Sequence, residues 1–179
     1  MKILFIVGSL RKDSLNAKLA HNLARIIGEV DADNKIEYAD VNLPLFNSDN
    51  YDHPDQLVIA LRDQIEATDL VFIVSPEYNH SISGVLKNAL DWTSWSSHNS
   101  WAGKKVVMAG ASPSSLGTAL AQVDTRKVLT FINANVFLRP EFYLSFAPRM
   151  FDANGDLVAD EVNFATTFIK ATLDFVANK

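Results

Sequence analysis

The stretch Ile3-Leu-Phe-Ile-Val-Gly-Ser-Leu-Arg-Lys-Asp-Ser-Leu-Asn16 determines how the rest of the chain is interpreted. Its first five residues are all apolar, without the alternation of a half-exposed strand, which is typical of a strand covered on both faces. The strand ends at Gly8, and a polar loop then leads into a helical pattern. A buried strand, a loop and a helix in this order predict the first unit of a parallel α/β sheet.

Three further apolar runs have the same character, at Leu70–Val74, Val106–Ala109 and Val136–Leu138. A weaker run, Ile36–Val41, includes Glu37 and Asp40 and favours an edge strand. Between the runs, apolar residues recur at the spacing of a helix stripe. The expected helices cover Leu15–Ile27, which ends at Gly28, and Leu57–Ile65, Gly84–Trp92, Leu116–Ile132 and Val158–Val176.

Strand and helix patterns therefore alternate along the chain. Right-handed crossovers on a parallel sheet predict an α/β fold of the three-layer, doubly wound type. We expect a five-stranded parallel sheet in the flavodoxin-like order 2-1-3-4-5, and a single domain that spans residues 1–179. Ligands of such sheets bind beyond the carboxyl ends of the strands, which directs attention to the loops after the first, third and fourth strands.

Composition excludes several classes of protein. The 179 residues carry a formal net charge of −5, which argues against a nucleic-acid partner. There is no cysteine, so disulfides, cysteine-ligated metals and thiol nucleophiles are excluded. The first apolar run is too short for a signal segment or a membrane span. We expect a soluble cytoplasmic protein with no membrane partner.

The first loop offers an inventory of anion-binding groups. Ser9, Ser14 and Asn16 are neutral donors, Arg11 adds a charged fork, and the following helix directs its N-terminal amides toward the loop. The alternative is that Ser14 only caps the helix while Arg11 and Lys12 are solvated. No phosphate-binding Walker loop or Gly-x-Gly-x-x-Gly fingerprint is present, so a mononucleotide fits better than NAD as the tightly held ligand.

The second and third loops are suited to a flat ligand. Residues 75–84 combine polar backbone with Tyr78, and residues 110–117 are small and rich in hydroxyl groups. A surface turn and a capped helix start, respectively, are the alternatives. Glu77 and His80 have the spacing of a helical metal motif, but neither a helix nor a second copy accompanies them. We therefore expect no metal site.

Aromatic residues gather near the loops rather than in the strands. They are Trp92, Trp95, Trp101, Phe142, Tyr143 and Phe146. They could fill the core beneath the loops, or they could form an interface or a wall over a cofactor.

Three motifs together resemble the NAD(P)H-dependent FMN reductase family, which includes quinone and azo-dye reductases. They are Gly8-Ser-Leu-Arg-x-x-Ser-x-Asn16, Pro76-Glu-Tyr-Asn79 and Gly84-Val-Leu-Lys-Asn-Ala-Leu-Asp-Trp92. The resemblance continues through Arg139-Pro-Glu-Phe142 and Phe151-Asp152 to the C-terminal helix. It implies three groups of FMN contacts. The phosphate would lie in the first loop, at Ser9, Leu10, Arg11, Ser14, Leu15 and Asn16. The ring would lie along Pro76, Glu77, Tyr78 and Asn79, and Ser112 would provide a third contact.

The resemblance implies an enzyme in which hydride passes from NAD(P)H through FMN to a quinone, free flavin or similar acceptor. The flavin would carry the redox chemistry, so no protein residue is expected to be a catalytic acid or base. Tyr78 and His80 are the expected wall of the acceptor site. The family also implies a homodimer or homotetramer.

Two departures from the family pattern bear on the choice of acceptor and nicotinamide. His80 stands where the family usually has Gly, and Trp95 where a Ser-Arg pair commonly follows the helix. The alternative function is a flavodoxin-type electron carrier, which also binds FMN but benefits from a strongly acidic docking face. The net charge of −5 is modest for that role. A phosphoacceptor domain is excluded because Ser9 and Ser75 occupy places where it needs acidic residues.

Overall fold

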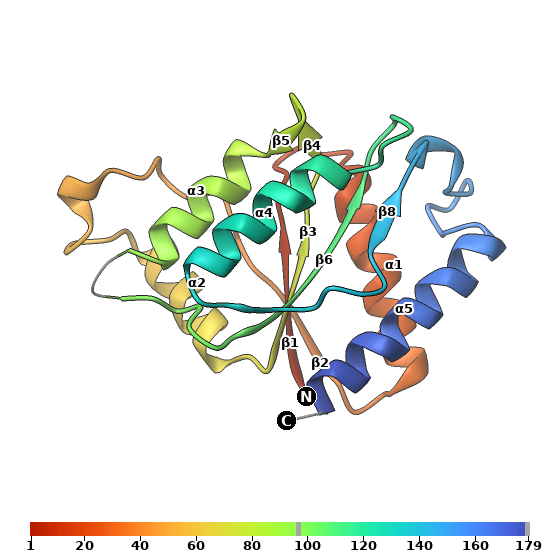
Figure 1. The fold of residues 1–179 in the computed structure, drawn as a ribbon, viewed down its shortest axis with the longest axis horizontal. Helices are drawn as coiled ribbons and strands as arrows, with labels where there is room; N and C mark the ends of the chain where they lie inside the picture. Colours follow the sequence, from red (N-terminus) through yellow and green to blue (C-terminus); the bar gives the residue numbers. More distant parts are fainter. Residues whose placement is uncertain (96–97, 178–179) are drawn as a thin grey trace.

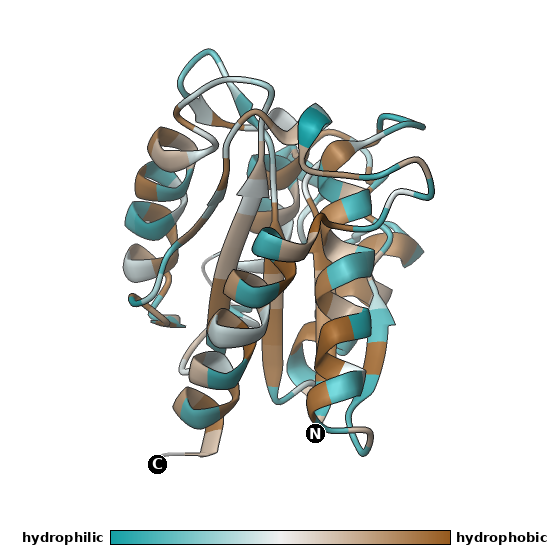
Figure 2. Ribbon diagram, turned by 90° about the vertical axis from the view of Figure 1, so that its right-hand side faces the viewer, coloured by the Kyte–Doolittle hydropathy of each residue, from teal (hydrophilic) through white to brown (hydrophobic). Residues whose placement is uncertain are grey.

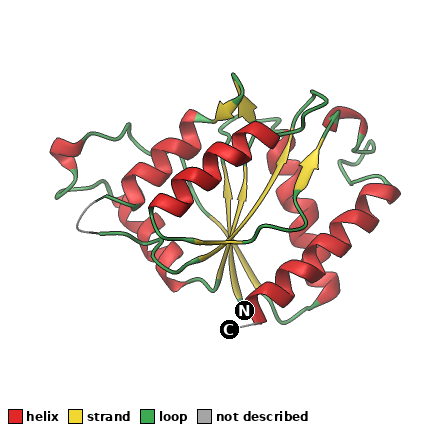
Figure 3. Ribbon diagram, in the orientation of Figure 1, coloured by secondary structure: helices red, strands yellow, loops and turns green. Residues whose placement is uncertain are grey.

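Three parallel strands form the centre of the sheet. The computed structural model describes residues 1–95 and 98–177. In it, β1 (Lys2–Val7), β3 (Leu70–Val74) and β6 (Lys105–Ala111) lie side by side in parallel (Figure 1). Every residue of β3 is buried, as expected for a strand covered on both faces. The order β2-β1-β3-β6-β7 confirms the predicted flavodoxin-like arrangement. Figure 3 shows the strands gathered in the centre of the molecule with helices on both sides.

The two edges of the sheet differ from the prediction. At one edge, β2 (Lys35–Tyr38) pairs in parallel with β1 and is shorter than the expected run. At the other edge, the expected strand Val136–Leu138 is wrong in its extent. β7 (Asn135–Val136) pairs with the beginning of β6, and β8 (Phe142–Leu144) pairs with its end. Pro140 lies between these two pieces, and its missing N–H cannot contribute to a ladder.

Helices cover both faces of the sheet. On one face, α1 (Leu15–Val30) and α5 (Ala159–Ala177) bury apolar residues against Phe5, Phe72 and their neighbours. On the other face, α2, α3 and α4 cover Ile6, Ile73 and their neighbours. These three helices span Gln56–Ala67, Gly84–Thr93 and Ala119–Phe131. Figure 2 shows the apolar strands enclosed between the helices. No helix among the described residues has the length and hydropathy needed to span a bilayer.

The smaller elements lie in the connections. Two short 3₁₀ helices cover Ser48–Asn50 and Ala147–Arg149. A hairpin of two short strands, β4 (Glu77–Tyr78) and β5 (Ser81–Ile82), follows β3 at the carboxyl end of the sheet (Figure 1). This hairpin occupies the loop in which the sequence places part of the site.

Two helix predictions need correction. The first helix does not end at Gly28 but continues to Val30, where the backbone N–H of the C-cap residue Asp31 bonds to Ile27 O. The fourth helix begins at Ala119 rather than Leu116. The residues that were expected to form its buried stripe include Leu120 and Val123, which are exposed, whereas its buried residues are Ala121, Gln122, Thr125 and Leu129. The buried face of α4 carries two polar residues, which apolar spacing alone does not detect.

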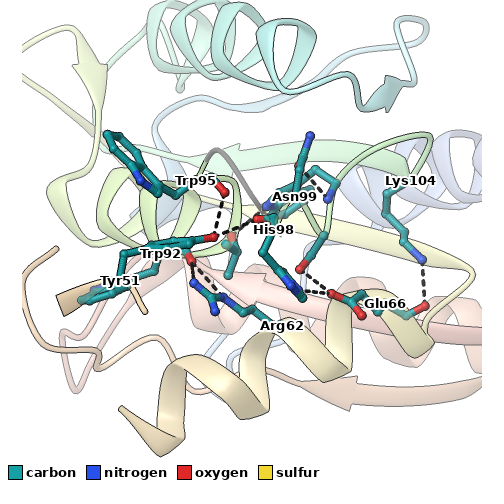
Figure 4. A network of polar contacts seen from close by, with 11 residues as sticks. Tyr51, Arg62, Glu66, Trp92, Trp95, His98, Asn99 and Lys104 are labelled. Carbon is teal, nitrogen blue, oxygen red and sulfur yellow. Dashed lines mark hydrogen bonds and ion pairs between the residues drawn. The ribbon is translucent and has the colours of Figure 1, made fainter. Parts of the chain in front are cut away.

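Three of the six aromatic residues near the loops, Trp92, Trp101 and Phe142, are buried within the chain itself. Trp92 and Trp101 are 2% and 1% exposed, whereas Trp95 is 42% exposed. Buried Arg62 on α2 donates from Nε and Nη2 to the carbonyl of Trp92, and its guanidinium lies 4.5 Å from the centre of the Tyr51 ring (Figure 4). Packing beneath loops therefore accounts for Trp92 and Trp101. Residues 96–97 of this segment lie outside the described residues.

A second group of polar contacts in Figure 4 joins α2 to the segment after α3. Glu66 Oε1 accepts from Ser100 Oγ at 2.8 Å and lies 2.6 Å from His98 Nε2. The hydrogen bond from Ser100 holds the pKa of Glu66 below its ordinary value against the opposing effect of burial, and His98 lowers it further. Glu66 lies near the end of α2, just before β3 begins, so this network lies away from the carboxyl ends of the strands.

Two glycine substitutions test the close contacts of the sheet. A Cβ at Gly110 would collide with the Thr118 side chain and would lie 2.6 Å from the backbone oxygen of Ser75. Gly110→Ala should therefore lower the free energy of unfolding by about 1–3 kcal/mol. Gly28→Ala is the matched control, because Gly28 is helical with nothing within 4 Å of its added Cβ. It should raise the free energy of unfolding by about 0.5–1 kcal/mol. Urea denaturation measures both, and equal effects would contradict this assignment.

Candidate functional site

A cavity of about 260 Å³ opens where β1, β3 and β6 end. All three loops that the sequence indicated contribute to its walls. Its lining consists of Ser9, Arg11, Ser14, Leu15, Asn16, Pro76, Glu77, Tyr78, Ala111, Ser112 and Pro113. The parallel topology explains the meeting point, because the carboxyl ends of parallel strands share one edge of the sheet.

The first loop and the start of α1 form the anion-binding end of the cavity. Ser14 is the N-cap of α1, and its Oγ accepts from Ala17 N at 3.2 Å. The N–H groups of Leu15 and Asn16 have no acceptor within the helix, because the first turn of any helix lacks them. Arg11 is exposed at the cavity, and no carboxylate in residues 1–95 or 98–177 forms a salt bridge with it. Free amides, a helix dipole and an unpaired guanidinium together suit a phosphate.

Asn16 has a structural role that the sequence did not indicate. Its side chain is buried and forms two hydrogen bonds with the backbone of Ala111, from Nδ2 to the carbonyl at 3.0 Å and from the Ala111 N–H to Oδ1 at 2.9 Å. Both polar atoms of the amide are thus committed within the protein. Asn16 therefore ties the first loop to the third, and its backbone N–H is the group available to a ligand.

A pair of buried hydroxyl groups ties the first loop to the second. Ser83 Oγ donates to the carbonyl of Gly8 at 2.8 Å and lies 3.3 Å from Ser75 Oγ. The same Ser83 oxygen caps α3 by accepting from Leu86 N at 3.2 Å. Gly8 is required here, because any Cβ at this position would collide with the Ser75 side chain.

The hairpin β4–β5 carries the aromatic residue of the site. Tyr78 lines the cavity and is 53% exposed. The hairpin turns through Asn79 and His80, whose φ angles are 51° and 60°. Both residues lie outside the cavity lining, as does Leu10. His80 is exposed, with Nδ1 at 3.4 Å from Glu77 Oε1.

The third loop adds two lining residues that the sequence did not single out, Ala111 and Pro113. They flank Ser112, whose Oγ accepts from Ser114 N at 3.2 Å and lies 3.1 Å from Ser114 Oγ. The small side chains of this loop were the available signal, because they allow a flat ligand to approach the backbone.

Comparison with known proteins identifies the family. The sequence profile of the NADPH-dependent FMN reductase family matches residues 1–149. The chain belongs to this family. A 2-hydroxy-1,4-benzoquinone reductase from a Burkholderia species is 38% identical over 173 residues, which cover 94% of this chain and 92% of that protein. An NAD(P)H-dependent FMN reductase from Pseudomonas aeruginosa is 40% identical over 164 residues, which cover 90% of this chain and 86% of its own length.

A solved structure gives the same result at the level of the fold. It is a flavoenzyme NAD(P)H:(acceptor) oxidoreductase from Paracoccus denitrificans, with a TM-score of 0.89 and 32% sequence identity. The match covers 98% of this chain and 97% of that one. The family resemblance and the flavodoxin-like fold are both confirmed.

The residues present in this chain fit the cofactor of the family. FMN combines a phosphate monoester with a flat ring, and the cavity combines an anion-binding end with an open end that is lined by Tyr78, small residues and backbone. The exposed Arg11 guanidinium and the N–H groups of the first turn of α1 match the phosphate.

Proposed function

We propose that this protein is an FMN-dependent NAD(P)H oxidoreductase that reduces quinones or similar small acceptors. The observation that carries the proposal is the cavity itself, with the exposed cation Arg11 and a helix N-terminus at one end and an exposed aromatic residue at the other. Relatives of this chain include a 2-hydroxy-1,4-benzoquinone reductase and a quinone reductase from Pseudomonas putida. Their similarity supports the same class of acceptor.

The proposed roles follow from the geometry. Ser9, Arg11 and Ser14, together with the backbone of Leu15 and Asn16, would hold the phosphate of FMN. Pro76, Tyr78, Ser112 and the backbone of Glu77 would border its ring. When bound, FMN supplies the hydride chemistry, by accepting hydride from NAD(P)H and delivering it to the acceptor. The protein therefore needs to bind and orient the reactants, and no side chain is assigned as a catalytic acid or base.

Tyr78 and His80 would form the wall of the acceptor site at different depths. Tyr78 lines the cavity, whereas His80 lies outside the lining with a side chain that is 73% exposed. We place His80 at the rim, where it would contact only acceptors large enough to extend beyond Tyr78. Leu10 and Asn79 do not line the cavity, so they would affect FMN binding only by setting the backbone conformation of their loops.

The chain would function as one FMN-binding domain over residues 1–179. Elements from both ends support this, because α5 packs in the same apolar core as α1 and β1. We also propose a cytoplasmic location, which is where NAD(P)H is available to such an enzyme.

Turnover distinguishes this enzyme from an FMN-binding electron carrier. The purified protein reconstituted with FMN should show a flavin absorption spectrum and should oxidise NADPH or NADH when a benzoquinone is added. A single-electron carrier would be reduced by a partner protein and would not consume NAD(P)H alone. A protein that remains colourless with FMN, or one that binds FMN without quinone-dependent NAD(P)H oxidation, would contradict the proposal.

Arg11→Ala tests the anion-binding end of the cavity. Loss of a charge-assisted hydrogen bond to phosphate should weaken FMN binding by about 1.5–3 kcal/mol. Quenching of FMN fluorescence during titration with the apoprotein measures this change. Lys12→Ala is the matched control, because Lys12 is the adjacent exposed cation and is absent from the cavity lining. Equal losses in the two variants would indicate a general charge effect rather than a direct contact.

We further propose that the protein self-associates through α4, as a homodimer or homotetramer. Trp92 and Trp101 do not support this, because both are already buried within the chain. Instead, the outer side of α4 and its approach leave large apolar side chains exposed. They are Leu116 at 45%, Leu120 at 41%, Val123 at 54% and Phe131 at 89%. Exposed apolar residues that gather on one element mark an interaction surface.

Light scattering should return a mass of two or four times the 19.8 kDa of one chain at micromolar concentration. Val123→Glu should shift the mass toward the monomer, because a charge in an apolar interface is desolvated without a partner. Leu45→Glu is the control, since Leu45 is 86% exposed and lies outside α4. A monomeric wild type, or equal effects of the two variants, would contradict an interface on α4.

A further inference from the structure

The carboxylate of Glu77 contacts a helix that begins 42 residues later in the chain. Its side chain is only 7% exposed, although it lines the cavity. Glu77 Oε2 accepts from the backbone N–H groups of Leu120 and Ala121, both at 3.0 Å. These are N–H groups of the first turn of α4, which spans Ala119–Phe131.

This contact replaces a cap that α4 lacks in its own sequence. The N-cap residue Thr118 makes no capping hydrogen bond with its side chain, and the first turn contains no acidic residue. Thr118 Oγ1 instead accepts from Gln122 Nε2 at 3.0 Å. A carboxylate at this position satisfies two free donors and complements the positive end of the helix dipole. Glu77 is therefore the N-terminal cap of α4, supplied from another part of the chain.

The same contact holds the hairpin β4–β5 in place. Each strand of this hairpin has two residues, and isolated hairpins are marginally stable even when they are longer. Its turn places Asn79 and His80 at positive φ, where glycine is the favoured residue. Neither the turn nor the ladder is strong. A second contact also reaches α4, because Ser81 Oγ donates to Asp124 Oδ2 at 2.6 Å.

We propose that Glu77 is a positioning residue of the site, whose carboxylate fixes the hairpin against α4 rather than binding the cofactor. Through this bond, Glu77 sets where Tyr78 and the backbone of residues 77–78 stand at the cavity. The role rests on the proposed function, since the ligand whose binding it would affect is FMN. It differs from a contact role, because Oε2 faces the helix amides and Oε1 lies near His80.

Three variants separate positioning from simple stability. Glu77→Ala removes the cap, Glu77→Gln keeps a carbonyl oxygen that can accept from the same amides, and Asp55→Ala removes a cap elsewhere. Asp55 is the N-cap of α2, and its Oδ1 accepts from Leu57 N at 2.8 Å. It does not line the cavity. The FMN dissociation constant is measured by fluorescence titration, and thermal stability and amide hydrogen exchange are measured on the apoprotein.

Glu77→Ala should raise the FMN dissociation constant about 10-fold, the size expected for losing a helix cap that also holds the hairpin. In the Glu77→Ala variant, the backbone N–H groups of Leu120 and Ala121 should also exchange their hydrogens faster than in the wild type. Glu77→Gln should stay within about 3-fold of wild type in FMN affinity, because only the charge effect is lost. Asp55→Ala should lower the melting temperature but leave FMN affinity unchanged.

The outcomes are distinct. Unchanged FMN affinity in Glu77→Ala, with faster exchange at the α4 amides, would reduce Glu77 to a structural cap and overturn the inference. Equal losses in Glu77→Ala and Glu77→Gln would show that charge, and not positioning, is what matters. If Glu77→Ala does not fold, Ser81→Ala takes its place and should raise the FMN dissociation constant about 3-fold, and no change would overturn the inference. Failure of the wild type to bind FMN would overturn the proposed function first.

Discussion

The structure depends on one constraint, which is that three neighbouring strands run in parallel and are covered on both faces. Each of these strands must be followed by a connection that returns over the sheet, so the strands all end at the same edge. The loops after β1, β3 and β6 consequently meet, although residues that they bring together, such as Asn16 and Ala111, are 95 positions apart in the sequence. Covering both faces also removes the sheet from contact with ligands, which leaves this edge as the place for a site.

Loops that meet at such an edge carry backbone N–H and C=O groups that form no hydrogen bonds with a neighbouring strand. Side chains of neighbouring loops form hydrogen bonds with these groups instead. Asn16 bonds to Ala111 across the first and third loops, and Ser83 bonds to Gly8 across the first and second. Glu77 does the same for the first turn of α4. These bonds fix the loops before any ligand arrives, which lowers the ordering cost of binding.

The sequence was sufficient for the features that depend on local pattern. The continuous apolar runs predicted the central strands, and the apolar stripe that begins at Leu15 predicted the start of α1. It was insufficient where the partner of a residue is remote. Nothing near Glu77 indicates that it caps α4, and nothing near Asn16 indicates that its amide is committed to Ala111. The buried face of α4 was not predicted because it contains the polar residues Gln122 and Thr125. Their side chains can be buried because they donate hydrogen bonds to the backbone carbonyls of Phe142 and Ala121.

The last strand of the sheet, divided into β7 and β8, has a consequence for the behaviour of the protein in a crowded solution. An open edge of a sheet offers a row of free backbone groups on which another chain can assemble, and long flat edges are a route to aggregation. Here one edge is formed by pieces of two and three residues, and the other by β2, a strand of four residues that includes Lys35 and Glu37. Neither edge provides a template of useful length. The sheet is thereby protected against uncontrolled growth at both sides.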